Sequence, residues 1–356
     1  MSKYVVLVVA VSIFHFGTAQ NNEADSLLRQ LVSKKHVVGA SAGYSVGGEI
    51  LWQQAVGYAD READKKFELQ TITRPASIAK PMTAIAVMQL VEQGKVDLDA
   101  PIQTYIPSYP KQPKTQITPR QLLSHTSGID GYKNVREAQT TKNYEDLTAA
   151  VAVFQDRKLL FEPGTRYSYS TYGYVVLGLL IEKVSGDTYE NYMKKNILDK
   201  AGMQHTGVEK YGVPVENKSK LYQWGKKGKI TEEAPNNLSN RIPAGGFYTT
   251  MGDLLKFGHA VLNHTLVSKA TLELMGKHHS LEKENNGYGF GWFLYGKKPN
   301  EGAILGHSGT QTGSSSQLFI VPSKQAVVVV LANTSRSWQA VIGTAAQLMN
   351  LALPKD

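Results

Sequence analysis

Strand-like segments lie at both ends of this chain, and helical segments lie between them. Near the N-terminus, the runs 37–46 and 49–60 flank Gly47-Gly48, a dipeptide typical of a tight β-hairpin. Strand character returns late in the chain, in the runs 287–296, 302–310, 315–322 and 325–333. One sheet can take strands from both chain ends. We therefore expect an α+β fold, an α/β sandwich whose central antiparallel sheet carries an inserted all-helical lobe.

Apolar residues at helical spacing indicate where the helices lie. Helices at 23–35 and 338–353 would flank the sheet. Between them we expect helices near 76–94, 144–157, 172–186 and 188–203, and an exposed polar loop at 226–237. No repeat or linker divides the chain. We therefore expect one domain over 20–356, with an α/β lobe of about 24–74 and 241–354 and a helical lobe of about 75–240.

The first residues have the pattern of a secretory signal peptide. One basic residue, Lys3, precedes an apolar run from Val5 to Phe16, which is too short to span a bilayer comfortably. Gly17 and Ala19 fit the small-x-small cleavage rule, so residues 1–19 are predicted to be removed. An uncleaved membrane anchor is the alternative. We expect an exported protein, periplasmic or extracellular and bacterial, without stable membrane insertion after cleavage.

Composition removes several kinds of function. The chain has no cysteine, which excludes disulfides, thiol catalysis and thiolate metal sites. Its net charge of +9 comes from scattered lysines without aromatic interleaving, so we expect no nucleic-acid partner. His36 and the pair His278-His279 lack metal-ligand spacing and acidic partners. We therefore predict no metal and no cofactor.

The stretch "RPASIAKPM" offers a candidate nucleophile. Ser77 and Lys80 are three residues apart, a spacing that brings two side chains together on one helical face. Pro81 is tolerated only near a first helical turn, which places Ser77 at or near a helix N-terminus. A serine hydroxyl becomes a good nucleophile only when a base takes its proton. Taken alone, the pattern fits a helix cap beside a surface lysine better than a nucleophile and its base.

Two later segments add candidate residues in a fixed order. Tyr169, Ser170 and Thr171 form a Tyr-x-Thr triplet before a predicted helix, and "GHSGT" includes His307, Ser308, Gly309 and Thr310 on a predicted strand. Tyr169 could instead be a packed aromatic residue, and His307 a buried core histidine. The nucleophile-elbow pattern with Ser308 at its centre fails, because Thr310 stands where glycine is required and no helix follows. His125 and Ser127 are expected in a structural loop beside the site, and Gly245-Gly246 in a tight turn near it.

These three segments resemble the motifs of the serine β-lactamase-related family. Class C β-lactamases, penicillin-binding D,D-peptidases and esterases of that fold carry Ser-x-x-Lys, then Tyr-x-Asn, then Lys-Thr-Gly or His-x-Gly. The runs "LLSHTSGI", "PGTRYSYST", "GGFYTTMGDLLKFG" and "GYGFGWF" are also similar. They resemble the branch that holds the mitochondrial serine β-lactamase-like protein and its bacterial relatives. The resemblance runs from about residue 25 to about residue 351 and implies a β-lactamase/transpeptidase-like fold.

The resemblance also implies a role for each residue. Ser77 would attack a carbonyl and become acylated, with Lys80 and Tyr169 sharing the proton transfer and the base left unassigned between them. Lys80 and His307 would stabilise a Tyr169 phenolate, whose pKa of about 10 is otherwise too high. The N–H groups of Ser77 and Thr310 would form an oxyanion hole. Thr171, Ser308 and Gly309 would complete the substrate-binding set.

Two positions depart from the family pattern. Thr171 stands where Asn is usual, and a hydroxyl lacks the paired donor and acceptor of an amide. His307 stands where Lys is usual, which replaces a fixed charge by a group that is mostly neutral at pH 7. Both changes argue against efficient β-lactam hydrolysis.

We therefore expect an exported serine hydrolase that acts through an acyl-enzyme on a small-molecule or peptide acyl substrate. A D,D-peptidase-like or β-lactamase-related amide hydrolase is favoured. A carboxylesterase of the same fold and a non-catalytic self-assembling scaffold are the alternatives. Homo-oligomer formation stays open.

Overall fold

A seven-stranded antiparallel sheet organises the part of the chain that the structure describes. The computed structural model describes residues 20–110, 116–225, 228–279, 281, 287–296 and 304–353, so the predicted leader 1–19 lies outside it. The strand order is β3-β2-β1-β11-β10-β9-β8. Their bounds are β1 Gly39–Val46, β2 Glu49–Asp60, β3 Lys65–Lys66, β8 Phe293–Tyr295, β9 Ile304–Gln311, β10 Ser314–Val321 and β11 Ala326–Ala332.

The two ends of the chain meet in the middle of this sheet. β1 and β2 form the predicted hairpin, and Gly47 and Gly48 both have positive φ, as a tight turn between twisted strands requires. On its other side β1 pairs with β11, with Ala40 opposite Ala332. The expectation that one sheet takes strands from both ends is confirmed.

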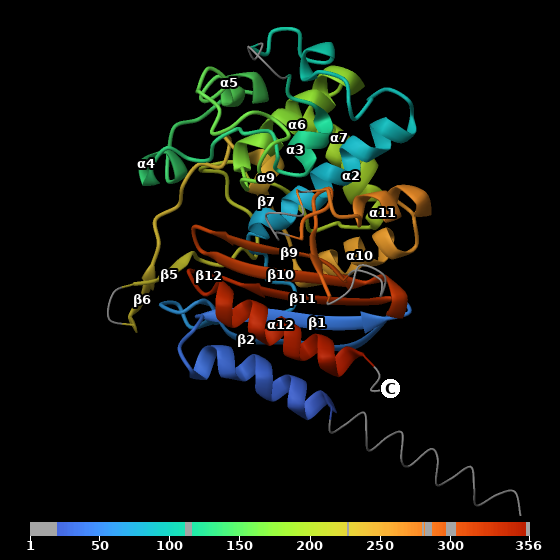
Figure 1. Cartoon of the computed structure of the whole chain (residues 1–356). Coiled ribbons are helices and arrows are strands. Elements are labelled where there is room, and N and C mark those ends of the chain that lie inside the picture. Colours follow the sequence, from blue (N-terminus) through green and yellow to red (C-terminus); the bar gives the residue numbers. More distant parts are fainter. Residues whose placement is uncertain are drawn as a thin grey trace, which may run out of the picture.

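Strand β11 is buried on both faces because helices cover both sides of the sheet. Val328 and Val330 contact a core that includes the N-terminal helix, described over 20–33, and α12 Trp338–Ala352. Val327 and Val329 face the opposite core, which includes α10 Met251–Leu262. This alternation follows from the two-residue period of a strand. The N-terminal helix and α12 lie side by side on one face of the sheet, as Figure 1 shows.

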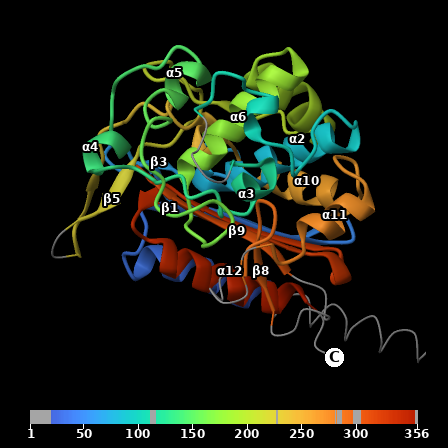
Figure 2. The ribbon, with the colours of Figure 1, turned by 45° about the horizontal axis from the view of Figure 1, so that its top comes forward.

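The opposite face carries the helical lobe, with two apolar helices at its centre. α2 Ala79–Glu92 and α6 Thr171–Ser185 are buried over most of their length. Gly186 ends α6 in the left-handed conformation, as its position predicts. Figure 2 shows the lobe on the side of the sheet away from α12. The other helices of the described residues are α3 Pro119–Leu123, α4 Val135–Ala138, α5 Leu147–Val151, α7 Tyr189–Met193, α8 Asp199–Ala201, α9 Ile242–Gly245 and α11 Lys269–Met275.

Three local predictions need correction. The helix expected over 144–157 is only the short α5, and the helix over 188–203 is interrupted by a π-helical turn at Lys194–Leu198. The predicted exposed loop 226–237 instead contains β6 Ile230–Glu232, which pairs with β5 Tyr222–Trp224. β5 in turn pairs with β12 Thr334–Ser335. The polar composition of this stretch gave no sign of β6, which pairs with β5.

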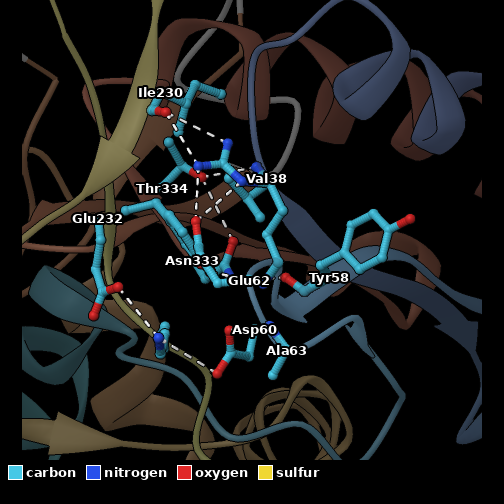
Figure 3. Close-up of polar contacts among 12 residues, drawn as sticks. Val38, Tyr58, Asp60, Glu62, Ala63, Ile230, Glu232, Asn333 and Thr334 are labelled. Atoms are coloured by element: carbon cyan, nitrogen blue, oxygen red, sulfur yellow. Dashed lines mark hydrogen bonds and ion pairs between the residues drawn. The ribbon is translucent and has the colours of Figure 1, made fainter.

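Asn333, which follows β11, ties three segments together (Figure 3). Its Oδ1 accepts the Gly39 N–H at 2.9 Å, and its Nδ2 donates to the Tyr58 carbonyl at 2.9 Å. Arg61, at the end of β2, donates to the carbonyl of Ile230 in β6. These bonds hold together the ends of β1, β2 and β11, where the late part of the chain meets the early part.

Candidate active site

Ser77 lies in a single 3-10 turn that leads into α2. This turn, Ala76–Ile78, places Ser77 just ahead of the first residue of the helix, as Pro81 predicted. The preceding residue, Ala76, has a φ of 50°, a left-handed conformation that a residue with a Cβ rarely adopts. The Pro75 carbonyl accepts the Ser316 hydroxyl at 2.8 Å, which binds the turn to the sheet. The surrounding contacts therefore hold Ser77 in one position.

Lys80 contacts Ser77 directly. The Lys80 side chain is fully buried, and its Nζ lies 3.1 Å from Ser77 Oγ and 3.0 Å from the Ala244 carbonyl oxygen. Within the described ranges, no carboxylate lies within ion-pair distance of this nitrogen. Burial, and after it the charge of Arg241, lower the pKa of Lys80 to about 7. An amine with this pKa is about half neutral at pH 7 and can accept a serine proton.

Tyr169 lies beside the same pair. Lys80 Nζ is 4.8 Å from the centre of the Tyr169 ring, and the Tyr169 hydroxyl interacts with Ser77. Burial raises the pKa of Tyr169 well above its usual range, and the Ser77 contact offsets only part of this effect. The raised pKa favours the neutral phenol over the predicted phenolate in the free protein. A neutral phenol can still relay a proton by accepting one and donating its own.

His307 is buried in β9 and is neutral. The Ser308 carbonyl can only accept, so the Nδ1–H of His307 donates to it at 2.7 Å. In a neutral ring the other nitrogen, Nε2, then accepts from the Tyr288 hydroxyl at 3.2 Å. Burial and the Lys80 charge lower the pKa of His307 to about 3. Its ring centre lies 6.1 Å from that of Tyr169. The structure thus brings His307 near the other three residues without a positive charge.

The predicted oxyanion and substrate-binding residues divide into two groups. Thr310 and Thr171 line one pocket with Ser77, a cavity of about 300 Å³ between the sheet and the helical lobe. Ser308 and Gly309 lie in β9 behind it, paired with β10. A Cβ on Gly309 would lie 2.4 Å from the Pro75 carbonyl oxygen, so glycine is required for the strand to approach the Ser77 turn. The oxyanion roles of Ser77 and Thr310 stay predictions.

His125 lies beside the site, as its loop predicted. Its ring centre is 4.3 Å from that of Tyr169, and its Nδ1 accepts the Ser170 N–H at 3.1 Å. Burial lowers the pKa of His125 well below its usual value, with the charge of Lys80 as the next cause. His125 is thus a neutral support for the Tyr169 segment. Gly245 lines the pocket as the last residue of α9.

Sequence reasoning missed a buried ion pair directly before the nucleophile. Arg74 is fully buried, and its Nε and Nη2 donate to the two carboxylate oxygens of Glu209 at 2.9 and 2.7 Å. Nη1 donates to the Asn236 side chain at 2.8 Å and to the Thr312 carbonyl at 3.0 Å. Arg74 therefore links the Ser77 turn to the end of β9. The only signal in the sequence is its position next to the Ser-x-x-Lys motif.

Arg241 and Tyr132 also line the pocket and were not predicted. No sequence pattern marks them, because each comes from a loop without a motif. A larger hollow of about 530 Å³, lined by residues of α10 and α11 and by Leu305, contains none of the predicted residues. Within the described ranges, no group of three or more His, Asp or Glu side chains could hold a metal ion. Over the same ranges, the longest apolar helices fall short of what a membrane crossing needs.

Comparison with known proteins agrees with this geometry. A model of the beta-lactamase family matches residues 24–350. The mitochondrial serine beta-lactamase-like protein LACTB of Bos taurus is 28% identical, over 87% of this chain and 73% of the bovine protein. The fold is similar to that of the octameric penicillin-binding protein homologue from Pyrococcus abyssi, with a TM-score of 0.80 and 27% identity over 92% of this chain and 77% of that one.

A second solved structure, the D-stereospecific amidohydrolase from Streptomyces sp., has a TM-score of 0.75 and 26% identity, over 91% of this chain and 98% of that one. The resemblance first indicated by Ser77, Tyr169 and His307 is thus confirmed along the described sheet and lobe. The family model spans nearly the whole of the sheet and the helical lobe. The chain belongs to the beta-lactamase family of serine hydrolases.

Proposed function

We propose that Ser77 is the nucleophile of an acyl-enzyme mechanism and that the protein is an exported amide hydrolase. The observation that supports this most directly is the 3.1 Å contact between Ser77 Oγ and Lys80 Nζ. Lys80 has no carboxylate partner among the described residues, and its pKa is lowered to about 7. A fully buried amine in this state is suited to take the proton of the hydroxyl it contacts.

Acylation would begin when neutral Lys80 takes the hydroxyl proton of Ser77. Ser77 Oγ then forms a bond to the substrate carbonyl carbon, and the carbonyl π electrons move to its oxygen. The N–H groups of Ser77 and Thr310 would stabilise that oxyanion. When the intermediate collapses, the bond to the leaving nitrogen or oxygen breaks, and Tyr169 relays the proton from Lys80 to it. Water then repeats the sequence on the acyl-enzyme and releases the acid.

Open-chain amides are favoured over β-lactams, whose amide bond lies in a four-membered ring, as substrates. His307 is neutral and bonded at both ring nitrogens, so the third motif offers no fixed cation to a substrate carboxylate. Thr171 lines the pocket where related sites place an amide. The solved neighbour from Streptomyces sp. is a D-stereospecific amidohydrolase, which supports a peptide-like acyl substrate. An esterase is the second candidate, since the same proton transfers serve an ester.

A fluorophosphonate probe tests the nucleophile. We expect an adduct on wild-type protein that mass spectrometry locates at Ser77, and none on Ser77→Ala. Ser26→Ala is the matched control, because Ser26 is an exposed serine of the N-terminal helix outside the pocket, and it should be labelled like wild type. An unlabelled wild type, or equal labelling of Ser77→Ala, would contradict the proposal. Rates on D-Ala-D-Ala peptides, 4-nitrophenyl esters and nitrocefin then rank the substrate classes.

The alternative of a different class is a non-catalytic scaffold that self-assembles. The Pyrococcus abyssi homologue is octameric, which makes the oligomeric state worth measuring. Light scattering on the mature chain, with and without Ser77→Ala, separates assembly from catalysis. Large assemblies combined with no adduct at Ser77 would favour the scaffold.

Export is tested by the mass of the protein recovered from the cell envelope, since removal of residues 1–19 leaves Gln20 as the first residue.

A further inference from the structure

Arg241 is a buried cation in the wall of the Ser77 pocket. It directly precedes α9, the short helix whose Ala244 carbonyl contacts Lys80, and only 5% of its surface is exposed. Its charge is the second cause of the low Lys80 pKa, which means that it lies close enough to act on the reacting groups. Arg241 also lines the same cavity as Ser77.

The acceptors that hold Arg241 are uncharged. Nε donates to the Asn240 side chain at 2.8 Å, and Nη2 donates to the Ala138 carbonyl at 2.6 Å. The guanidinium carbon lies 4.4 Å from the centre of the Tyr132 ring. Glu137, whose backbone carbonyl Arg241 also contacts, turns its own carboxylate to Arg157 at 2.5 Å. Within the described ranges, the Arg241 guanidinium therefore lies in the pocket wall without an anionic partner.

Arg241 lies next to the position where the chain departs from the family pattern. Tyr132 interacts with both Thr171 and Arg241, and all three line the pocket. The small Thr171 side chain thus leaves Tyr132 and the guanidinium beside the cavity. Because Nε and Nη2 of Arg241 already donate to protein acceptors, Nη1 is the nitrogen that a carboxylate would contact. This side of the pocket has the charge that neutral His307 lacks.

The other charges of the pocket differ between its two sides. Glu233, on the sheet side, accepts the Gly313 N–H and the Ser335 hydroxyl, each at 2.8 Å, and is 8% exposed. Arg336 lines the same side but is exposed to solvent, where its charge is screened. An anionic group would meet the buried carboxylate of Glu233 on the sheet side. Arg241 offers it a buried cation on the helical side.

We infer that Arg241 binds a carboxylate of the substrate, so that the enzyme prefers esters and amides carrying a free carboxylate near the scissile bond. This inference rests on the proposed function of Ser77, since it assigns the specificity of the same pocket. The interaction would supply the anion with a charge-assisted hydrogen bond in a site shielded from water. It would also give the buried guanidinium the charged partner that the described residues do not provide.

The test compares two substrates that differ only in charge. They are the mono-4-nitrophenyl ester of glutaric acid and the corresponding 4-nitrophenyl methyl glutarate. We expect wild type to show a higher kcat/KM on the acid, and Arg241→Gln to lower the ratio of the two values about 10- to 100-fold. A second pair, 4-butyryloxybenzoate and its methyl ester, carries the charge on the leaving group. The pair that responds shows which side of the scissile bond bears the carboxylate.

The ratio separates binding from structural support. A change in the Lys80 pKa alters kcat/KM by the same factor for both substrates of a pair, so it cancels in the ratio of the two values. Arg29→Gln, on the N-terminal helix with a side chain that is 65% exposed, removes the same charge far from the pocket and should leave both ratios unchanged. If Arg241→Gln lowers kcat/KM equally for both substrates of each pair, Arg241 is only structural and the inference is overturned.

Three further outcomes keep the test decisive. If Arg241→Gln does not fold, the wild-type ratios and those of Arg241→Lys decide, and wild-type ratios at or below one for both pairs overturn the inference. Hydrolysis without a preference for charge removes the carboxylate site and leaves the proposed function intact. If no ester is hydrolysed and Ser77 takes no fluorophosphonate, the proposed function fails and this inference fails with it.

Discussion

Two buried cations, Arg74 and Lys80, lie on the same short segment and have opposite surroundings. Arg74 donates to both carboxylate oxygens of Glu209, to an amide and to backbone carbonyls. Among the described residues, Lys80 donates hydrogen bonds to the Ser77 hydroxyl and the Ala244 carbonyl and has no carboxylate partner. Both side chains are 0% exposed. Burial alone therefore does not distinguish the residue that supports the site from the residue proposed to react.

The difference lies in whether the charge has a partner. A buried cation with a well-placed carboxylate stays charged and holds its surroundings in place. A buried amine without one loses its proton easily, which lowers its pKa into the range useful for catalysis. Arg74 shows no such role, because a guanidinium stays protonated in proteins. Arg74 thus supports the structure of the site, and Lys80 is suited to take part in the reaction, although the two lie six residues apart. Substitutions at both positions can test this comparison.

The largest effect is expected for Lys80→Met. Without a base beside Ser77, kcat/KM should fall by about 10²- to 10⁴-fold, while the protein should remain folded because no buried carboxylate loses its partner. Stopped assays on a 4-nitrophenyl ester and urea unfolding measure the two quantities. Lys183→Met, on the exposed side of α6, is the matched control and should change neither. An activity loss of less than threefold for Lys80→Met would rule out a proton-transfer role.

The reverse pattern is expected for Arg74→Met. Glu209 would keep only Lys218, at 2.6 Å, so the free energy of unfolding should fall by about 3 kcal/mol, at the low end for a broken buried pair. Urea unfolding measures this loss. Activity per folded molecule should fall less than in Lys80→Met, because Arg74 acts on Ser77 only through the turn. An Arg74→Met protein as stable as wild type would show that the pair contributes nothing to the fold.

The pH dependence should follow the Lys80 amine. With a folded pKa of about 7, kcat/KM should rise about tenfold per pH unit below pH 7 and level off above it. The unfolded chain, with a lysine pKa of about 10.4, binds more protons between pH 7 and 10.4. This group therefore makes stability rise with pH across that window. Arg241→Gln should move the kinetic midpoint to higher pH; a midpoint that stays fixed would exclude its charge as a cause.

The smallest effect is expected at the surface pair of Arg120 and Asp99. Its geometry is also bidentate, with distances of 2.6 and 2.7 Å, but the side chains are 37% and 65% exposed. Solvent and salt screen such pairs, so a double-mutant cycle should give a coupling below about 1 kcal/mol. The same cycle on Arg74 and Glu209 should give a larger value. Equal couplings would mean that burial does not control the strength of these pairs.

The sequence was most informative where local pattern and spacing decide the structure. The hairpin at Gly47-Gly48, the long α6 and the turn that presents Ser77 follow from glycine, periodicity and Pro81. The meeting of Ser77 with Tyr169 and His307 could be predicted from the order of three family motifs. The Tyr288 contact of His307, and the burial that lowers its pKa to about 3, could not be predicted, because both depend on tertiary packing.

Long-range polar contacts were beyond sequence reasoning. Arg74 meets Glu209 and Asn236, which lie 135 and 162 residues away. The polar stretch that contains Glu233 was predicted as an exposed loop, yet its carboxylate is buried against Gly313 and Ser335. A polar residue gives no local signal of the partner that will bury it. Arg241 was missed for the same reason.

The sheet built from both chain ends has a consequence for the order of events during synthesis. The Gly39 N–H binds the side chain of Asn333, 294 residues later, and β1 has no partner other than β2 until β11 has been made. Closing so long a loop is slow, and the exposed edge of β1 must meanwhile be kept from other strands. Residues 304–311, which approach the Ser77 turn, come equally late. A ribosome therefore makes nearly the whole chain before this hydrolase can assemble its active site.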